Sequence, residues 1–212
     1  MKIGVIGAGH IGGTAAQLFV DAGHTVILSN SRGPETLQEQ VEALGPNAVA
    51  KPADQAAAEG DVVMEAIPFG YVDQLPAAEL DGKILVTASN YYPDRDGRIG
   101  AVEDDGRTQS EWTSQHVEGA RVVKAFNTIY WEHLRDQGNT SLSLEDRRVI
   151  PVAGDDEKAK AIVCDLIEAI GFAPLDMGTL REGGQRMQPG EPIYNKGWTL
   201  ADARERLKMP PA

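Results

Sequence analysis

The most informative part of the chain is its beginning, MKIGVIGAGHIGGTAAQLFVDAGHTVILSNSR, residues 1–32. Lys2 to Ile6 is typical of a short apolar strand, and the glycine pattern GAGHIG of residues 7–12 follows it directly. Apolar residues then recur at helical spacing, and a second apolar strand runs from Thr25 to Leu28. A G-x-G-x-x-G pattern alone is weak evidence, but the order strand, glycines, helix and strand favours a dinucleotide-binding site over an ordinary glycine-rich turn.

Each part of this pattern has a physical reason. Gly7 allows a tight turn out of the strand, Gly9 lets a diphosphate approach the backbone, and Gly12 lets the helix pack against the strand. The first helical N–H groups, from His10 and Ile11 onward, face an anionic ligand at the positive end of the helix dipole.

The end of the second strand selects the nucleotide. An NAD site usually has Asp or Glu there, but this chain has Ser29, Asn30, Ser31 and Arg32. The Arg32 guanidinium can pair with the oxygens of a 2′-phosphate and stack on adenine, although an arginine exposed in a turn is the alternative. We therefore expect NADP rather than NAD.

Composition sets limits on the partners. The chain has 212 residues and a formal charge of −12, which disfavours a nucleic acid or an anionic membrane as partner. Its one cysteine forms no internal disulfide, and no metal-ligand spacing is present, so no metal site is expected. No apolar run is long enough to span a bilayer, and the first strand begins at residue 2, which predicts no targeting peptide and a cytoplasmic location.

Strand-like segments alternate with helical ones along most of the chain. This alternation predicts an α/β fold of the Rossmann type, a doubly wound, mostly parallel sheet. It stops near Gly178, so we expect an NADP-binding domain over residues 1–178 and a C-terminal extension over residues 179–212 that packs near the ligand crevice. Residues 94–107 and 178–192 are expected to be loops.

Ligands of such sheets lie beyond the carboxyl ends of the strands. Pro68 and Phe69 are expected to form an apolar wall there, and Asn127 and Thr128 to bond a carboxamide or a ring carbonyl. Ordinary strand-end roles are the alternative for each residue. The cofactor-binding residues predicted in these segments are Ile67, Pro68, Phe69, Ser89, Asn90, Ala125 and Asn127.

Few residues suit acid–base catalysis. His133 is the only histidine near a crevice loop, and its helical flanks suit packing equally well. Lys124 occupies an alternating strand position and is as compatible with structure as with function. No Ser-His-Asp or Cys-His arrangement is visible, so no catalytic residue is predicted.

Four segments resemble a known family: GAGHIG at residues 7–12, SNSR at 29–32, AIPF at 66–69 and VKAFNT at 123–128. They are similar to the NADP oxidoreductases that depend on coenzyme F420, a deazaflavin, and to the reductase domain of the STEAP ferric reductases. The resemblance covers nearly the whole chain. It implies hydride transfer between NADPH and a deazaflavin or flavin, usually in a homodimer. The segment YYPDRDG at residues 91–97 is typical of a bacterial branch of the family, which leaves the acceptor open.

Three functions remain compatible with the sequence. The first is reduction of a deazaflavin or flavin by NADPH. The second is an NADP-dependent dehydrogenase or imine reductase, but the roughly thirty-five residues after the last predicted strand leave no room for the helical domain of such enzymes. The third is a non-catalytic NADPH-sensing module. The expected partner is a small-molecule redox acceptor.

Overall fold

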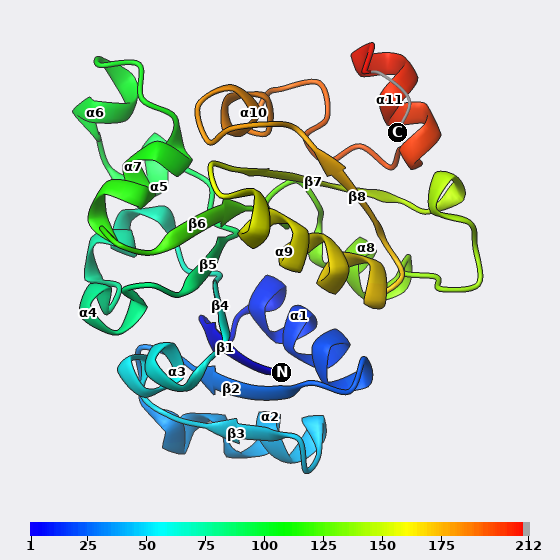
Figure 1. Cartoon of the computed structure of the whole chain (residues 1–212). Helices are drawn as coiled ribbons and strands as arrows, with labels where there is room; N and C mark the ends of the chain where they lie inside the picture. Colours follow the sequence, from blue (N-terminus) through cyan, green and yellow to red (C-terminus); the bar gives the residue numbers. More distant parts are fainter. Residues whose placement is uncertain (210–212) are drawn as a thin grey trace.

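The computed structural model describes residues 1–209 and contains one eight-stranded sheet within them (Figure 1). The strand order is β3-β2-β1-β4-β5-β6-β7-β8. Neighbouring strands are parallel except for β6 and β7, which are antiparallel. This confirms the predicted Rossmann-type, doubly wound and mostly parallel sheet. The strands are β1 (Lys2–Ile6), β2 (Thr25–Ser29), β3 (Ala48–Ala50), β4 (Val62–Glu65), β5 (Ile84–Thr87), β6 (Arg121–Lys124), β7 (Val149–Gly154) and β8 (Ala173–Asp176).

Helices cover both faces of the sheet because successive strand side chains point to opposite sides. In β4, Val62 and Met64 join one core cluster and Val63 joins the other. The first cluster packs under α1 (His10–Asp21), η1 (Pro34–Leu37), α2 (Gln38–Leu44), α8 (Trp131–Asp136) and α9 (Glu157–Ala169). The second packs under α3 (Ala53–Glu59), η2 (Phe69–Gln74), α4 (Ala77–Leu80) and α7 (Gln109–His116).

Three short helical elements lie in segments expected to be loops. These are α5 (Pro93–Asp96) and α6 (Gly100–Glu103) in the first segment and α10 (Glu182–Arg186) in the second. One-turn helices have too few residues for an apolar period, so the sequence pattern gives no signal for them. The remaining elements are η3 (Leu144–Asp146) and α11 (Leu200–Leu207).

The segment after β8 folds back onto β7 and β8. Met187, Ile193 and Leu200 are buried there against Val149 and Leu175. Arg148, directly before β7, and Thr199, in the tail, form an isolated antiparallel bridge. Residues 179–209 thus share a core cluster with the edge of the sheet.

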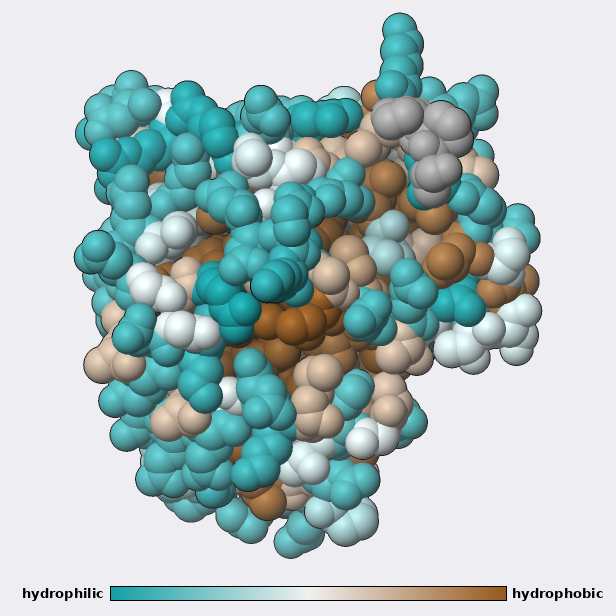
Figure 2. Space-filling view, viewed as in Figure 1, coloured by the Kyte–Doolittle hydropathy of each residue, from teal (hydrophilic) through white to brown (hydrophobic). Residues whose placement is uncertain are grey.

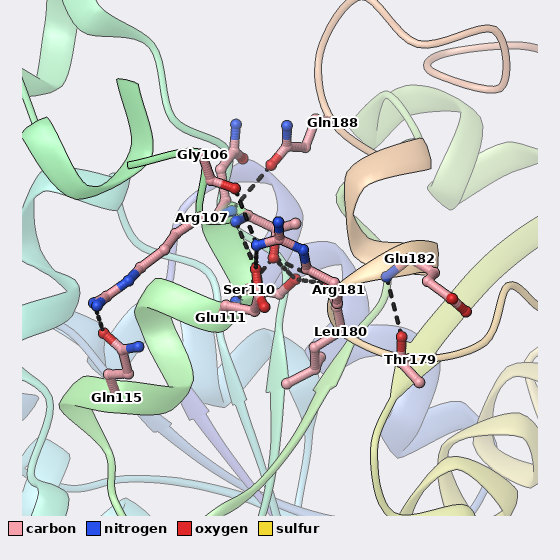
Figure 3. A network of polar contacts seen from close by, with 12 residues as sticks. Gly106, Arg107, Ser110, Glu111, Gln115, Thr179, Leu180, Arg181, Glu182 and Gln188 are labelled. Atoms are coloured by element: carbon pink, nitrogen blue, oxygen red, sulfur yellow. Dashed lines mark hydrogen bonds and ion pairs between the residues drawn. The ribbon is translucent and has the colours of Figure 1, made fainter. Parts of the chain in front are cut away.

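The same segment is also fixed to α7 (Figure 3). The hydroxyls of Thr108 and Ser110 donate to the carbonyl oxygen of Leu180 over 3.0 and 3.1 Å, respectively. The Gln109 backbone N–H donates to the side chain of Gln188 over 3.0 Å. A Cβ on Gly184 would stand 2.2 Å from Ser110 Oγ, so glycine permits this close approach of α10 to α7. These contacts hold the tail against the N-terminal end of α7.

Apolar residues gather in the middle of the face on which α1 and α9 lie, and polar residues surround them (Figure 2). Ile11, Leu18 and Ile162 are partly buried side chains that pack onto the core from these helices. Within residues 1–209, no helix has the length and apolar character needed to cross a membrane.

Candidate cofactor site

The glycine turn between β1 and α1 is shaped for close approach. Gly7 has a φ of 108°, and a Cβ there would stand 2.5 Å from the carbonyl oxygen of Ala66. A Cβ on Gly12 would stand 1.8 Å from the carbonyl oxygen of Gly7, so only glycine lets the helix pack this closely. By contrast, a Cβ on Gly9 would meet no protein atom within 4 Å. Gly9 therefore faces open space, as a diphosphate-binding backbone requires. No side chain caps the N-terminus of α1, which leaves its N–H groups free for an anion.

A cavity of about 640 Å³ opens beside this turn, at the carboxyl ends of β1, β2 and β4. Its volume is within the range of small-molecule sites. None of its lining residues carries an acidic side chain. They are Ile6, Gly7, Ala8, Gly9, Asn30, Ser31, Ala53, Ala66, Ile67, Pro68, Tyr71, Gln74, Leu75 and Pro76. The cavity thus contains six of the predicted residues: Gly7, Gly9, Asn30, Ser31, Ile67 and Pro68.

The predicted residues in the turn after β2 have different positions: some stabilise the turn, and others lie on the surface. Ser29 is fully buried and its hydroxyl donates to the carbonyl oxygen of Val5, so its side chain does not face the cavity as expected. Asn30 accepts from the Arg32 backbone N–H over 3.0 Å and donates to Thr36 over 2.9 Å, which fixes the turn. Arg32 is exposed and directly follows Ser31, which lines the cavity, but Arg32 is not itself a lining residue. No ion-pair partner of Arg32 exists within residues 1–209.

The prediction that Phe69 forms part of an apolar wall of the ligand site is wrong. Phe69 is fully buried, and its ring packs against Tyr91 and Trp112, with ring centroids 5.6 and 4.8 Å away. Helix η2 begins at Phe69, directly after Pro68, and buries the ring in the core below α7. The aromatic side chain at the cavity is Tyr71, which is 55% exposed.

A second cavity, of about 210 Å³, lies at the carboxyl ends of β5 and β6. Both cavities border the N-terminus of α1, since Gly9 lines the larger and Ile11 the smaller. The walls of the smaller cavity are apolar and aromatic, with carboxamides between them. The lining residues are Ile11, Ala88, Asn90, Phe126, Asn127, Ile129, Tyr130, Trp131, Tyr194 and Asn195.

The predicted Ser89 and Ala125 lie beneath this cavity and are buried. Ser89 donates to the Glu65 carboxylate over 2.8 Å, and Thr87 donates to the same oxygen. The Lys124 ammonium group donates to the carbonyl oxygen of Ser89 over 3.0 Å. Burial raises the pKa of Glu65 and lowers the pKa of Lys124 to about 8. This network connects the ends of β4, β5 and β6 below both cavities.

The two histidines considered in the sequence lie near the smaller cavity but do not line it. His10 is exposed and stacks on Trp131, with ring centroids 4.6 Å apart, so it connects α1 to α8. His133 is half-buried, and its ring edge faces Tyr130 at 6.0 Å. Neither is among the residues that line the two cavities.

The sequence missed the aromatic walls of this cavity. Tyr130 and Trp131 follow Asn127 closely, so their position in the chain was a usable signal. Tyr194 and Asn195 belong to the extension that was expected near the ligand crevice, but the sequence did not single them out, because they reach the cavity only through the folding of the tail. Phe126 has a φ of 63°, an uncommon value for a bulky residue, which turns the chain sharply after β6.

A Rossmann-type sheet with a glycine turn, an uncapped helix and an open cavity above it defines a dinucleotide-binding protein. Residues 2–91 match the model of the family described as NADP oxidoreductase, coenzyme F420-dependent. This part of the chain is thus similar to that family, and the match supports an NADP-dependent oxidoreductase.

Three known proteins are similar to this chain in sequence or structure. It is 29% identical over 181 residues to the metalloreductase STEAP3 of Rattus norvegicus; the match covers 84% of this chain and 34% of that protein, so the chain spans about a third of its length. A hypothetical protein of Sinorhizobium meliloti is 33% identical, with a TM-score of 0.81, over 94% of this chain and 95% of that one. A structure from Arthrobacter sp., described as an F420-dependent NADP reductase, is 25% identical, with a TM-score of 0.70, over 85% and 86% of the two chains.

Proposed function

We propose that this protein is an NADPH-dependent oxidoreductase that transfers hydride between NADP(H) and a deazaflavin, coenzyme F420, or a flavin. The observation that carries the proposal is the smaller cavity, which has aromatic walls and carboxamides. Among the described residues, no carboxylate, imidazole or ammonium group lines it. Reduction of a conjugated ring system spreads the charge over the ring, so stacking and orientation contribute more than an ionised acid.

The two cavities suit the two ends of the cofactor. The larger cavity and the open face of Gly9 suit the adenosine and the diphosphate, with Arg32 beside the 2′-phosphate. The smaller cavity, on the other side of the first turn of α1, suits the nicotinamide ring. The acceptor ring would then lie toward Tyr130 and the tail residues Tyr194 and Asn195.

A second candidate is an NADP-dependent imine reductase or small-molecule dehydrogenase. The observation in its favour is the Tyr194 hydroxyl on the cavity wall, because reduction of an imine or carbonyl needs a hydrogen-bond donor at the heteroatom. The extension after β8 contains only the short helices α10 and α11 within the described residues. A non-catalytic NADPH-sensing module is the third possibility.

An acceptor panel separates these functions. NADPH is mixed with the protein and coenzyme F420, FMN, FAD or a cyclic imine, and the decay of the reduced nicotinamide absorbance is followed. We expect decay with a deazaflavin or flavin, and none with Gly9→Val, which blocks the diphosphate position. Decay with the imine alone would support the second candidate. Tight NADPH binding with no decay in any mixture would support the sensing module.

A further inference from the structure

Two tyrosine hydroxyls meet at the smaller cavity although they are far apart in the sequence. Tyr194 lines the cavity from the tail, and its hydroxyl is hydrogen-bonded to that of Tyr92, which belongs to the segment after β5. The Tyr92 side chain is 38% exposed and therefore reaches solvent. No ionised side chain shares the cavity with Tyr194 within residues 1–209.

A chain of carboxamides fixes how Tyr194 is bonded. The Asn127 Nδ2 group donates to the carbonyl oxygen of Met187 over 2.7 Å and to Asn90 Oδ1 over 3.0 Å. The Asn90 Nδ2 group donates to the carbonyl oxygen of Asn127 over 2.8 Å and to the Tyr194 hydroxyl oxygen over 3.4 Å. Main-chain carbonyl oxygens only accept, so they set the orientation of both amides. The Tyr194 oxygen must therefore accept from Asn90.

The remaining bonding capacity of Tyr194 follows from simple valence. A hydroxyl has one donor and two acceptor positions. Asn90 fills one acceptor position, and the Tyr92 hydroxyl fills the other when it is the donor of the pair. The Tyr194 O–H is then free to donate to a ligand in the cavity. Burial raises the pKa of Tyr194, which keeps this hydroxyl protonated at neutral and mildly alkaline pH.

Tyr92 is itself held in place. The Arg95 guanidinium lies over the Tyr92 ring, 5.1 Å from its centroid, and also donates to the carbonyl oxygen of Asn90 over 2.6 Å. One side chain thus connects the two groups that bond the Tyr194 oxygen.

From this geometry, and resting on the proposed function, we propose that the Tyr194 hydroxyl recognises the hydride acceptor by donating to one of its heteroatoms, with Asn90 and Tyr92 as positioning residues. The acceptor class is a planar molecule with a ring carbonyl oxygen or a ring nitrogen at its edge. Deazaflavins, flavins and cyclic imines all have such an atom, whereas a bare metal ion does not.

The test compares three tyrosine-to-phenylalanine variants. Tyr194→Phe removes the proposed donor and keeps the ring, and Tyr92→Phe removes its hydroxyl partner. Tyr91→Phe is the matched control, because the Tyr91 hydroxyl bonds to Gly97 and Glu103 and Tyr91 lines neither cavity. For each variant we would measure the acceptor KM with the best acceptor of the panel, the NADPH Kd and the melting temperature. Binding of oxidised FMN and coenzyme F420 to the NADP⁺ complex is measured by fluorescence.

We expect Tyr194→Phe to weaken acceptor binding about three- to tenfold, the value of one neutral hydrogen bond, with the NADPH Kd unchanged. Tyr92→Phe should give a smaller loss. Tyr91→Phe should lower the melting temperature but leave the acceptor KM unchanged. The proposal is overturned if Tyr194→Phe has no effect on acceptor KM or probe binding, or if the wild-type complex binds neither probe. Probes that bind through Tyr194 but do not oxidise NADPH would uphold this inference and refute the proposed reaction instead.

Discussion

Arg32 is the residue expected to contribute most to the preference for NADPH over NADH. It is exposed, it directly follows Ser31, which lines the larger cavity, and no acid lines that cavity. We predict that Arg32→Ala weakens NADPH binding roughly ten- to a hundredfold, because a hydrogen bond to a charged group contributes about 1.5–3 kcal/mol. NADH lacks the 2′-phosphate and serves as the internal control, with little change expected. Calorimetric titration measures both, and equal losses for the two nucleotides would show that Arg32 does not read the phosphate.

Gly9 and Gly12 separate binding from folding within one turn. A Cβ on Gly9 meets no protein atom within 4 Å, and its φ of −76° suits any residue. Gly9→Val should therefore fold normally, with an unchanged circular dichroism spectrum and melting temperature, yet lose NADPH binding. Gly12→Ala should instead unfold at lower temperature, because its Cβ would stand 1.8 Å from the Gly7 carbonyl oxygen. Normal NADPH binding by Gly9→Val would mean that the diphosphate does not lie against this turn.

At the level of elements, a buried polar network crosses three neighbouring strands. Glu65, Thr87 and Lys124 are aligned by the register of β4, β5 and β6, and all are almost completely buried. A buried ammonium group is costly, and burial accordingly lowers the pKa of Lys124 to about 8. The network orders the strand ends next to both cavities. The free-energy cost of burying the Lys124 ammonium group therefore arises close to the proposed site.

The pH dependence of stability tests this cost. Lys124 has a pKa of about 8 in the folded protein and about 10.4 when unfolded, so the unfolded chain binds more protons in this window. The destabilisation is complete below pH 8 and is relieved as the pH rises toward 10. Glu65 has a raised pKa and the opposite slope, so Glu65→Gln is used as the background.

In this background the Lys124 pKa lies below about 8, because the Glu65 carboxylate raises it in the wild-type protein. Urea unfolding should show that Glu65→Gln gains stability relative to Glu65→Gln/Lys124→Met as the pH rises from below 8 toward 10. A constant difference between the two proteins over this range would mean that the Lys124 ammonium is not destabilised by burial.

For the molecule as a whole, sequence reasoning worked where pattern and period are strong. Residues 1–32 contain a strand, glycines and a helix whose geometry is nearly obligatory, and the parallel sheet follows from the alternation that continues after them. It failed at Phe69 because a strand-end position does not say on which side of the turn a ring is buried. It placed the extension near the crevice but did not single out Tyr194, whose position depends on contacts between the tail, α7 and Asn127.

The division into residues 1–178 and 179–212 stays a prediction, and residues 210–212 of it lie outside the described part. The structure shows that residues 179–209 share a buried cluster with β7 and β8 and line the smaller cavity through Tyr194 and Asn195. The homodimer and the cytoplasmic location also stay predictions.

The most direct test of the proposed reaction is a single-turnover transfer of deuterium. NADPH carrying deuterium at C4 of the nicotinamide, on either face, is mixed with the protein and coenzyme F420, and the products are analysed by mass spectrometry. We predict that deuterium from one face appears in the reduced deazaflavin, because stacking in the smaller cavity brings one face of the nicotinamide against the acceptor ring. If NADPH labelled on either face stays bound and keeps its deuterium, and coenzyme F420 stays oxidised, hydride transfer to a deazaflavin would be contradicted.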